Sequence, residues 1–395
     1  MTRFLFVVPP LVGHVNPLVG VAAELRARGH ATAWAGLPEL VGPLAGPGAR
    51  VLRCAVAAGD AAPPRPPELR GPAALKFLWA DFLVPLAEAM APGVARAVAR
   101  FEPDVLVVDQ QALAGALVAE RLGLPWVTTA STSAEFTGAL DGMPLVAAWI
   151  EGLLAELRGR LAGPDRTADP RFSPYLTLAF TTPELAGPLA APAGPVRFVG
   201  PSVTARPAAG AFPWEWLDPD RATVLVSLGT ANTDAGTQFL TACREALRER
   251  AGRLQAVIAD PGGVLGPPAG DADVLVLPSV PQLDLLPRTA AVVCHAGHNT
   301  VCEALWHGVP LVVAPIRDDQ PVVAGQVVAA GAGVRVRFGR TGADRLGRAV
   351  DAVLDDPAHR AAARRIGGSF RAAGGAAAAA TCLEQLRTPA VRRAR

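Results

Sequence analysis

The stretch Ala291-Val-Val-Cys-His295-Ala-Gly297-His-Asn299-Thr-Val-Cys-Glu303-Ala-Leu-Trp-His-Gly308 decides the fold of the second half of this chain. Residues 291–294 form a short apolar run of the kind that a parallel sheet buries on both faces. Ala296 and Gly297 follow, and both are small enough to let a ligand approach the backbone. A helix then begins near Asn299 and ends at Gly308, because glycine commonly follows the last residue of a helix.

A strand that leads through small residues into a helix offers a site for an anion. The first N–H groups of the helix have no intrahelical acceptor, and the positive end of the helix dipole lies there. His295 adds a hydrogen-bond donor at the turn, and Glu303 lies inside the helix, where it can reach hydroxyl groups. A structural histidine and a solvated glutamate are the alternatives. We interpret the stretch as a pocket for a nucleotide diphosphate.

The next apolar strand, residues 310–314, also ends in polar residues. Asp318, Asp319 and Gln320 follow it, at the carboxyl end of a strand, where α/β sheets bind their ligands. Carboxylates and an amide provide both acceptors and donors for sugar hydroxyls. This cluster therefore strengthens the interpretation of the preceding motif as a ligand site.

The first half of the chain opens with another buried strand, residues 4–8. A loop over residues 9–16 follows, in which Asn16 caps a helix and Pro17 occupies its first position. That helix ends at Gly29. His14 is therefore expected in the loop beyond the carboxyl end of the first strand, on the ligand-binding side of an open sheet.

Asp109 ends another short apolar strand, residues 105–108. If this strand is a neighbour of the first, His14 and Asp109 meet at one edge of the sheet. A histidine oriented by a carboxylate can take a proton from a hydroxyl group, because the carboxylate fixes the tautomer and stabilises the imidazolium. A loop histidine with a structural hydrogen bond and a carboxylate that caps a helix are the alternatives.

The motifs together resemble the signature of family 1 glycosyltransferases. The resemblance rests on His295-Ala-Gly-His-Asn-Thr-Val-Cys-Glu303, on Gly308-Val-Pro310, on Asp319-Gln320 and on the Gly13-His14 loop, so it extends over nearly the whole chain. That family includes plant small-molecule glycosyltransferases and bacterial enzymes that glycosylate macrolides and other natural products. It implies an α/β fold of two Rossmann-like domains whose parallel sheets face each other across a cleft, the GT-B fold.

The resemblance also implies roles for residues of this chain. His14 would be the catalytic base, with Asp109 as its partner. The donor would be a UDP- or dTDP-sugar, bound without a metal ion or other cofactor. The diphosphate would contact Ser227, Gly229, Thr230, His295, Gly297, Asn299 and Thr300; the nucleoside would contact Ser279, Val280, Gln282 and Glu303; and the sugar would contact Asp319 and Gln320.

Two positions depart from the family pattern. Ser279 stands where the family usually has an aromatic residue that stacks on the base, and Val323 stands where an asparagine is frequent. The sequence therefore predicts neither base stacking nor the choice of sugar, and it does not separate UDP from dTDP.

The acceptor is expected to bind in the first half of the chain. Residues 75–90 carry Phe82 on a helical pattern that is typical of a core helix or of a wall of an apolar pocket. Ser131 and Phe136 follow a strand at residues 125–127, and Met143 begins a helix over 142–160. Phe82, Ser131, Phe136 and Met143 are the candidate acceptor-binding residues.

Composition bounds the class of protein. The 395 residues suit two domains, and a hydrophobic content of 51% with 18% charged residues is typical of a globular chain. A formal net charge of +2 without a basic run argues against nucleic acid as a partner. We expect an N-terminal acceptor domain over 1–201, a linker over 202–220, a donor domain over 221–375, and a C-terminal helix and tail over 376–395 that pack on the N-terminal domain.

The cellular setting follows from the cysteines and the apolar runs. The five cysteines show no paired spacing, which fits a reducing cytoplasm. The N-terminal apolar run is too short for a signal peptide, and no uninterrupted apolar span suggests a membrane helix. We expect a cytoplasmic monomer or homodimer.

The sequence thus favours an inverting glycosyltransferase that acts on a hydroxyl group of a small, largely apolar natural product, as in antibiotic biosynthesis and other secondary metabolism. A nucleotide-sugar epimerase and a catalytically silent protein that binds a nucleotide sugar remain alternatives. A dinucleotide-dependent oxidoreductase is disfavoured, because no Gly-x-Gly-x-x-Gly follows the first strand.

Overall fold

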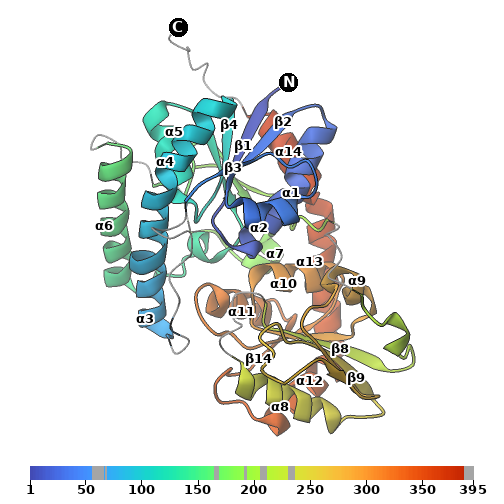
Figure 1. The fold of residues 1–395 in the computed structure, drawn as a ribbon. Coiled ribbons are helices and arrows are strands. Elements are labelled where there is room, and N and C mark those ends of the chain that lie inside the picture. Colours follow the sequence, from blue (N-terminus) through green and yellow to red (C-terminus); the bar gives the residue numbers. More distant parts are fainter. Residues whose placement is uncertain are drawn as a thin grey trace. The chain divides into compact units, whose positions relative to one another are not determined.

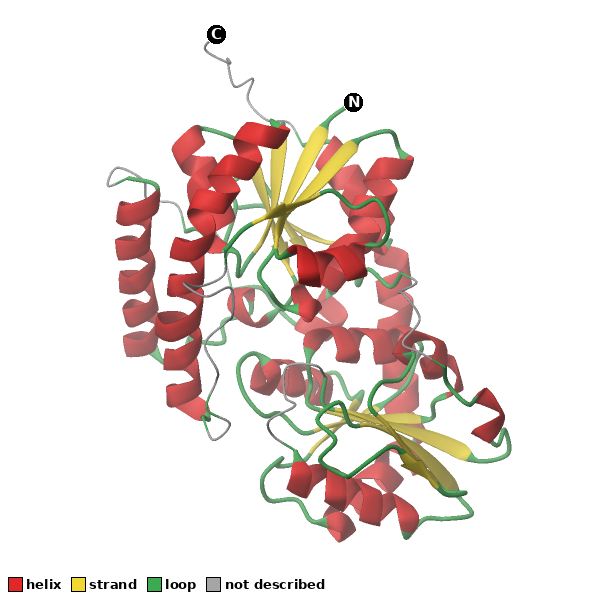
Figure 2. Ribbon diagram, viewed as in Figure 1, coloured by secondary structure: helices red, strands yellow, loops and turns green. Residues whose placement is uncertain are grey.

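The computed structural model of this chain describes residues 1–55, 66, 69–163, 169–190, 194–204, 211–229 and 236–386. Its contacts divide the chain into two units. The first comprises Met1–Thr182, Pro188–Thr204 and Ala373–Arg395, and the second comprises Pro183–Gly187 and Ala205–Ala372. Each unit is a parallel or mainly parallel sheet covered by helices (Figures 1 and 2).

The first unit contains a seven-stranded parallel sheet with the order β3-β2-β1-β4-β5-β6-β7. Its strands are β1 Arg3–Val7, β2 Ala31–Gly36, β3 Val51–Arg53, β4 Val105–Asp109, β5 Trp126–Ala130, β6 Thr177–Ala179 and β7 Val196–Phe198. The strand order reverses between β1 and β4. The carboxyl ends of these two neighbours therefore flank the switch point at which open α/β sheets bind ligands.

Helices cover both faces of this sheet. They are α1 Val12–Ala27, α2 Pro38–Ala45, α3 Gly71–Lys76, α4 Val84–Phe101, α5 Leu113–Leu122, α6 Pro144–Leu161 and α14 Gly375–Glu384, with a π-helical segment at Phe77–Leu83 and a 3₁₀ helix at Ala134–Phe136. Leu5 and Val7 pack toward α4, α5 and α6, whereas Phe4 and Phe6 pack toward α1, α2 and α14. Each strand is thus apolar on both faces, which explains the continuous apolar runs in the sequence.

The start of α1 differs from the prediction. The helix begins at Val12, with Leu11 rather than Asn16 at its N-cap, so His14 lies in the first helical turn and not in a loop. The N–H groups of His14 and Val15 both donate to the carbonyl of Leu11, at 3.0 and 3.2 Å. Pro17 lies inside the helix. A proline near the N-terminus of a helix removes a single hydrogen bond, so the turn before it can still form.

One helical run in the described part of the chain is long and apolar enough to cross a membrane, by length and composition alone. It covers Gly71–Phe101, and half of its most apolar window is buried. Met90 and Val94 of this run are fully buried in the cluster that contains Leu5 and Val7 of the sheet. Packing against the sheet therefore accounts for its apolar character.

The second unit contains a seven-stranded sheet with the order β10-β11-β9-β8-β12-β13-β14, parallel except for β10. Its strands are β8 Ala222–Ser227, β9 Leu254–Ala259, β10 Ala269–Gly270, β11 Val274–Leu277, β12 Ala291–Cys294, β13 Leu311–Val313 and β14 Gly333–Arg335. Its helices are α7 Pro183–Ala186, α8 Thr237–Arg248, α9 Gln282–Leu285, α10 His298–Trp306, α11 Gln320–Ala329, α12 Ala343–Asp355 and α13 Pro357–Ala373, with short 3₁₀ turns at Trp214–Trp216 and Leu286–Arg288. The order reverses between β8 and β12. The predicted α/β fold with two parallel-sheet domains is confirmed.

Helix α7 lies inside the interval 1–201 that the sequence assigned to the first domain, yet it groups with the second unit. Its contact with α11 includes a hydrogen bond of 3.2 Å from Nε2 of Gln326 to the carbonyl of Ala186. At the other end of the chain, α14 packs in the same apolar cluster as α1. The N–H of Gly375 donates to the carbonyl of Val199 at 2.6 Å, which ties the start of α14 to the first unit.

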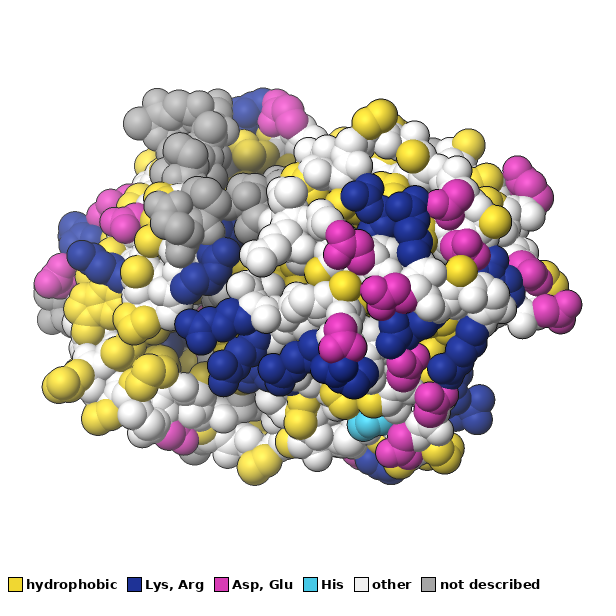
Figure 3. All heavy atoms as spheres, turned by 90° about the horizontal axis from the view of Figure 1, so that it is seen from below, with side chains coloured by type: hydrophobic (Ala, Val, Ile, Leu, Met, Phe, Trp, Pro, Cys, Tyr) yellow, Lys and Arg dark blue, Asp and Glu magenta, His cyan; other side chains and the backbone are white. Residues whose placement is uncertain are grey.

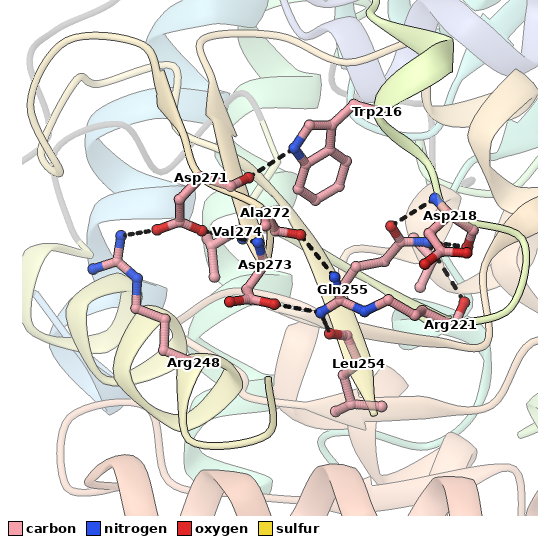
Figure 4. A network of polar contacts seen from close by, with 11 residues as sticks. Trp216, Asp218, Arg221, Arg248, Leu254, Gln255, Asp271, Ala272, Asp273 and Val274 are labelled. Carbon is pink, nitrogen blue, oxygen red and sulfur yellow. Dashed lines mark hydrogen bonds and ion pairs between the residues drawn. The ribbon is translucent and has the colours of Figure 1, made fainter. Parts of the chain in front are cut away.

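The predicted linker, 202–220, has its second part fixed to the second unit by a polar network (Figure 4). Nε1 of Trp216 donates to the carbonyl of Asp271 at 2.8 Å. The side chain of Gln255 accepts from the N–H of Asp218 at 3.0 Å and donates to its carbonyl at 2.7 Å. Arg221 pairs with Asp273 at 2.5 Å. Residues 216–221 are therefore fixed to the second unit by hydrogen bonds and an ion pair; residues 205–210 of the interval lie outside the described part.

Charge is unevenly distributed on the surface although the formal net charge is only +2. On the face shown in Figure 3, arginine and lysine side chains form a band, and acidic side chains border it. The chain has no run of basic residues, so this band forms only on folding.

Candidate functional site

The predicted strand, turn and helix at 291–308 are present as β12 and α10. Ala296 lies between them with a φ of 65°, a left-handed conformation that is uncommon for a residue other than glycine. Gly297 is the N-cap of α10, and the N–H of Val301 donates to its carbonyl at 3.0 Å. Gly308 has a φ of 69° and its N–H donates to the carbonyl of Leu305 at 2.9 Å, which ends the helix.

His295 is enclosed by glycines from two neighbouring loops. β8 and β12 are paired so that Ser227 lies beside Cys294, which brings the turn after each strand together. A Cβ atom on Gly229 would lie 2.7 Å from Cε1 of His295, and one on Gly297 would lie 2.3 Å from its Nε2. The imidazole therefore occupies space that only glycine at both positions leaves open.

Burial makes His295 a neutral group at physiological pH. Desolvation lowers the pKa of its imidazole to about 4, a hydrogen bond with the backbone of Ser227 opposes the shift, and the positive charge of Arg317 adds to it. A neutral imidazole donates one hydrogen bond without carrying charge. His295 therefore offers a ligand a neutral hydrogen-bond donor, and not the positive charge of an imidazolium.

The first turn of α10 adds further groups beside His295. Asn299 is partly exposed and Thr300 is 9% exposed, and both lie where the N–H groups of the helix have no intrahelical acceptor. Ser227 is buried at the end of β8. Thr230, which the sequence also assigns to the diphosphate, lies outside the described residues.

The structure brings two of the predicted nucleoside residues together. Nε2 of Gln282 donates to Oε2 of Glu303 at 2.6 Å, and Glu303 is only 3% exposed. Val280 is partly buried against the core of the second unit, whereas Ser279 is exposed. The carboxylate of Glu303 is thus held by an amide from the first residue of α9.

The predicted sugar-binding residues follow β13, which pairs with β12. Oε1 of Gln320 accepts from the N–H groups of Ile316 and Arg317, at 2.9 and 3.1 Å, so the side chain orders the loop that leads into α11. Asp319 is partly exposed at the N-cap of that helix. The amide NH₂ of Gln320 and the carboxylate of Asp319 are therefore the groups that can meet a ligand.

In the first unit, three side chains form a hydrogen-bonded group at the switch point of the sheet. Nδ1 of His14 lies 2.8 Å from Oδ1 of Asp109 and 2.7 Å from Oγ of Ser131. The hydroxyl of Ser131 donates to Oδ2 of Asp109 at 2.7 Å. Asp109 is fully buried, while His14 retains 16% exposure of its side chain. The predicted meeting of His14 with Asp109 is therefore found.

This geometry fixes the tautomer of His14. Asp109 has both oxygens occupied, since its Oδ1 also accepts from the N–H of Gln111 at 2.9 Å. A buried carboxylate can only accept, so Nδ1 of His14 must carry the proton that is shared with it. Nε2 then carries the lone pair of the ring. The arrangement leaves one basic ring nitrogen on a side chain that reaches solvent.

Comparison with known proteins identifies the family. The family described as UDP-glucoronosyl and UDP-glucosyl transferase matches residues 196–368. The chain is 33% identical over 408 residues to the 4'-demethylrebeccamycin synthase of Lentzea aerocolonigenes, across 94% of this chain and 96% of that relative. It is 30% identical over 418 residues to the demethyllactenocin mycarosyltransferase of Streptomyces fradiae, across 99% of this chain and 87% of that relative. The chain belongs to this glycosyltransferase family.

The fold of this glycosyltransferase also matches solved structures. The spinosyn rhamnosyltransferase SpnG complexed with thymidine diphosphate is similar with a TM-score of 0.76 and 25% identity, across 97% of this chain and 100% of that chain. The recognition of the family from its sequence motifs and the expected GT-B fold are both confirmed. Among the residues that the structure describes in this glycosyltransferase, no group of three or more His, Cys, Asp or Glu side chains is placed to hold a metal ion.

The predicted acceptor residues of the glycosyltransferase occupy different environments. Ser131 contacts His14 directly. Phe82 is partly buried in the π-helical segment, and Met143 is 42% exposed before α6. Phe136 is 1% exposed, and its ring packs edge-on against that of Phe198, with 6.3 Å between the ring centroids. Its side chain therefore belongs to the core beneath the strand ends. The sequence pattern did not separate these environments because apolar residues serve in both.

Sequence reasoning missed two charged groups of the glycosyltransferase. Arg317 is 4% exposed and lowers the pKa of His295, so its charge lies close to the predicted diphosphate site. Glu135 lies in the 3₁₀ helix that follows Ser131, with a buried Oε2. Both occur directly beside residues that were singled out, and for Glu135 the available signal was its charge among small residues.

Proposed function

We propose that this chain transfers a sugar from a UDP- or dTDP-sugar to a hydroxyl group of a small, largely apolar natural product, with inversion at the anomeric carbon. The relatives named above support the class of reaction, because they are a synthase of 4'-demethylrebeccamycin and a mycarosyltransferase of demethyllactenocin. The thymidine diphosphate in the related SpnG structure supports dTDP as the nucleotide of the donor.

The observation that carries this proposal is the hydrogen-bonded group of His14, Asp109 and Ser131. Because Nδ1 is held by Asp109 at 2.8 Å, Nε2 is the nitrogen that accepts the proton of the acceptor hydroxyl. Asp109 then stabilises the imidazolium that forms. The acceptor oxygen forms its bond to the anomeric carbon as the bond from that carbon to the diphosphate oxygen breaks, and the bonding electrons leave with the diphosphate.

The second unit supports the other half of the reaction. Negative charge grows on the diphosphate oxygen as the bond breaks, and the N-terminus of α10 with the donor group of His295 would stabilise it. Arg317 would add positive charge nearby. We infer that no metal ion is needed for departure of the nucleotide, since these fixed donors supply the same electrostatic help. Glu303 and Asp319 would bind ribose and sugar hydroxyls.

None of the five cysteines forms a disulfide in the structure, and we infer that the enzyme works in the reducing cytoplasm. We expect this setting because nucleotide sugars are the co-substrates that the proposed reaction requires.

The first experiment tests the donor site by calorimetry with UDP and dTDP, without added metal, on the wild type and on His295→Ala. We expect binding that the substitution weakens by roughly tenfold or more. The same titration on His14→Ala is the control, because that residue lies in the other unit. Failure of both nucleotides to bind the wild type would contradict the donor assignment.

A second experiment tests the reaction itself. Product formed from UDP-glucose or dTDP-glucose, both α-linked, is examined by proton NMR for the configuration at the anomeric carbon. We expect a β-linked product, and we expect His14→Ala to bind nucleotide normally while losing transfer. An α-linked product would contradict inversion, and undiminished transfer by His14→Ala would contradict its role as the base. Nucleotide binding without any transfer would favour the silent auxiliary protein.

A further inference from the structure

Beyond the group that holds His14, a second acidic side chain lies at the same edge of the first sheet. Glu135 is in the 3₁₀ helix Ala134–Phe136, close after Ser131, which contacts both His14 and Asp109. Oε2 of Glu135 is buried and has no hydrogen-bond partner among the described residues. A buried acceptor without a partner costs free energy, so its retention beside a candidate active site calls for an explanation.

Arg171, the charged group with the largest effect on Glu135, does not donate a hydrogen bond to Oε2, because its own hydrogen bonds go elsewhere. Arg171 binds Asp169 through two nitrogen atoms, with Nε 3.0 Å from Oδ1 and Nη2 2.7 Å from Oδ2. Its guanidinium also lies over the rings of Trp79 and Phe172, with centroids 5.7 and 5.5 Å away. These contacts hold Arg171 in place. It acts on Glu135 through its charge, whereas its hydrogen bonds are directed to Asp169.

The backbone around this cluster is firmly held. Oγ1 of Thr128, in β5, donates to the carbonyl of Arg171 at 3.1 Å and accepts from the N–H of Ser173 at 2.8 Å. Oγ of Ser173 in turn donates to the carbonyl of Trp126 at 2.6 Å. The loop before β6 is therefore tied to the strand that leads to Ser131 and Glu135. Glu135 stands on a rigid support, as a recognition residue requires.

The charges around Glu135 set its protonation. Burial raises the pKa of its carboxyl group to about 7; Arg171 opposes this shift, Asp169 and Asp109 add to it, and His14 opposes it. The interaction with Asp109 and His14 means that Glu135 lies close enough to sense the charge of the proposed catalytic pair. A carboxyl group with such a pKa gains strongly from a ligand that donates a hydrogen bond to it.

We propose that Glu135 recognises the acceptor by accepting a hydrogen bond from a second O–H or N–H group of that molecule, while His14 takes the proton of the hydroxyl that is glycosylated. This inference rests on the proposed function and deepens it. It assigns the acceptor to molecules that carry, besides the reacting hydroxyl, a further hydrogen-bond donor. A site built to bind such a donor discriminates strongly against an analogue that lacks it, because the buried oxygen then stays unpaired.

The test compares two aromatic alcohols of nearly equal size, 2-naphthol and 2,6-dihydroxynaphthalene, as acceptors with dTDP-glucose and UDP-glucose as donors. Wild type is expected to have a lower KM for the diol. In Glu135→Gln, the KM for the diol is expected to rise by roughly tenfold, because the neutral amide oxygen is a weaker acceptor than the carboxylate, while the KM for 2-naphthol and for the donor changes little. Glu156→Gln is the matched control, since that side chain is 73% exposed on α6.

The pH profile provides a readout that a merely structural role would not change. For the diol, wild-type kcat/KM should rise as Glu135 ionises near its shifted pKa, and this limb should be absent in Glu135→Gln. Thermal melting of Glu135→Gln and Glu135→Asp shows whether each variant is folded. If the wild type transfers sugar but Glu135→Gln treats both alcohols as the wild type does, the inference is wrong while the proposed function stands. If the wild type transfers sugar to neither alcohol, both are rejected.

Discussion

A Cβ atom on Gly297 would lie 2.3 Å from Nε2 of His295, although the backbone of Gly297, with a φ of −61°, suits any residue. The same ring would meet a Cβ on Gly229 at 2.7 Å, where a φ of 72° adds backbone strain. Gly297 and Gly229 therefore leave the space that the ring of His295 occupies. Any larger residue must displace the imidazole from the N-terminus of α10.

Gly297→Ala is accordingly expected to weaken binding of UDP and dTDP by roughly tenfold or more, because the displaced ring no longer donates to the diphosphate. Backbone strain cannot explain such a loss at this position. Gly342→Ala is the matched control, since Gly342 is also the N-cap of a helix, its φ is −81°, and nothing lies within 4 Å of the added Cβ. Calorimetry measures the three proteins; equal affinity of Gly297→Ala and the wild type would contradict the argument.

The neutral state of His295 predicts how donor binding depends on pH. A nucleotide sugar brings two negative phosphate groups close to the imidazole, which raises its pKa from the low value of about 4 and favours proton uptake on binding. Affinity for UDP-glucose or dTDP-glucose should therefore increase by roughly 3- to 10-fold from about pH 7 to about pH 5. His295→Gln should lose this increase. Calorimetry at both pH values measures these affinities. An equal change of affinity with pH in the wild type and in His295→Gln would contradict the role of His295.

The same shift affects stability with a definite sign. The folded pKa of His295 lies below its ordinary value of 6.5, so the unfolded chain takes up this proton more readily. The stability that neutral His295 contributes is thus present above about pH 6.5 and is lost as the pH falls toward about 4. The melting temperature of the wild type should fall more steeply over this window than that of His295→Gln. Parallel curves would mean that His295 is not desolvated in the folded protein.

The group of His14, Asp109 and Ser131 predicts a graded series of variants. His14→Ala removes the base and should lower kcat/KM by roughly 10²- to 10⁴-fold. Asp109→Asn replaces the carboxylate that fixes the Nδ1–H tautomer, so a loss of similar order is expected. Ser131→Ala removes one hydrogen bond from each partner and should cost roughly tenfold or less. All three should bind nucleotide like the wild type. Transfer by Asp109→Asn at the wild-type rate would contradict the assigned tautomer.

The sequence predicted the parts of this molecule that depend on short apolar runs and on residues beside them. Buried strands in a parallel sheet are apolar on both faces, so β1, β4, β8 and β12 were recognisable, and a polar residue at the end of β4, β8 and β12 marked the ligand side. The predicted start of α1 at Asn16 was wrong. The prediction relied on Asn16-Pro17, which is a strong signal for a helix N-terminus, whereas the helix begins at Val12. Contacts with the carbonyl of Leu11 outweighed that local signal.

Long-range packing decided what the sequence could not. Arg317 is a buried charged residue and Glu135 has a buried Oε2, and a sequence does not reveal that a charged group in a short segment is buried. Gln320 was predicted as a sugar ligand, yet its Oε1 also accepts from two backbone N–H groups, a contact that depends on how the loop after β13 folds. Ser131 and His14 are 117 positions apart, and only the order of the strands places them together.

Glu135 gives a last prediction, which concerns stability alone. Burial raises its pKa from 4.5 to about 7, so the folded protein holds this proton more tightly than the unfolded chain, and the stability due to Glu135 falls as the pH rises through this window. Glu135→Gln removes the ionisable group. Relative to the wild type, the variant should therefore gain about 1 to 3 kcal/mol between about pH 5 and about pH 8, a range that allows for partial screening by solvent. Melting temperatures at both pH values measure this gain, with Glu156→Gln as the exposed control. If wild type and Glu135→Gln differ in melting temperature by the same amount at both pH values, burial does not raise the pKa of Glu135. That result would contradict the desolvation expected of its buried Oε2.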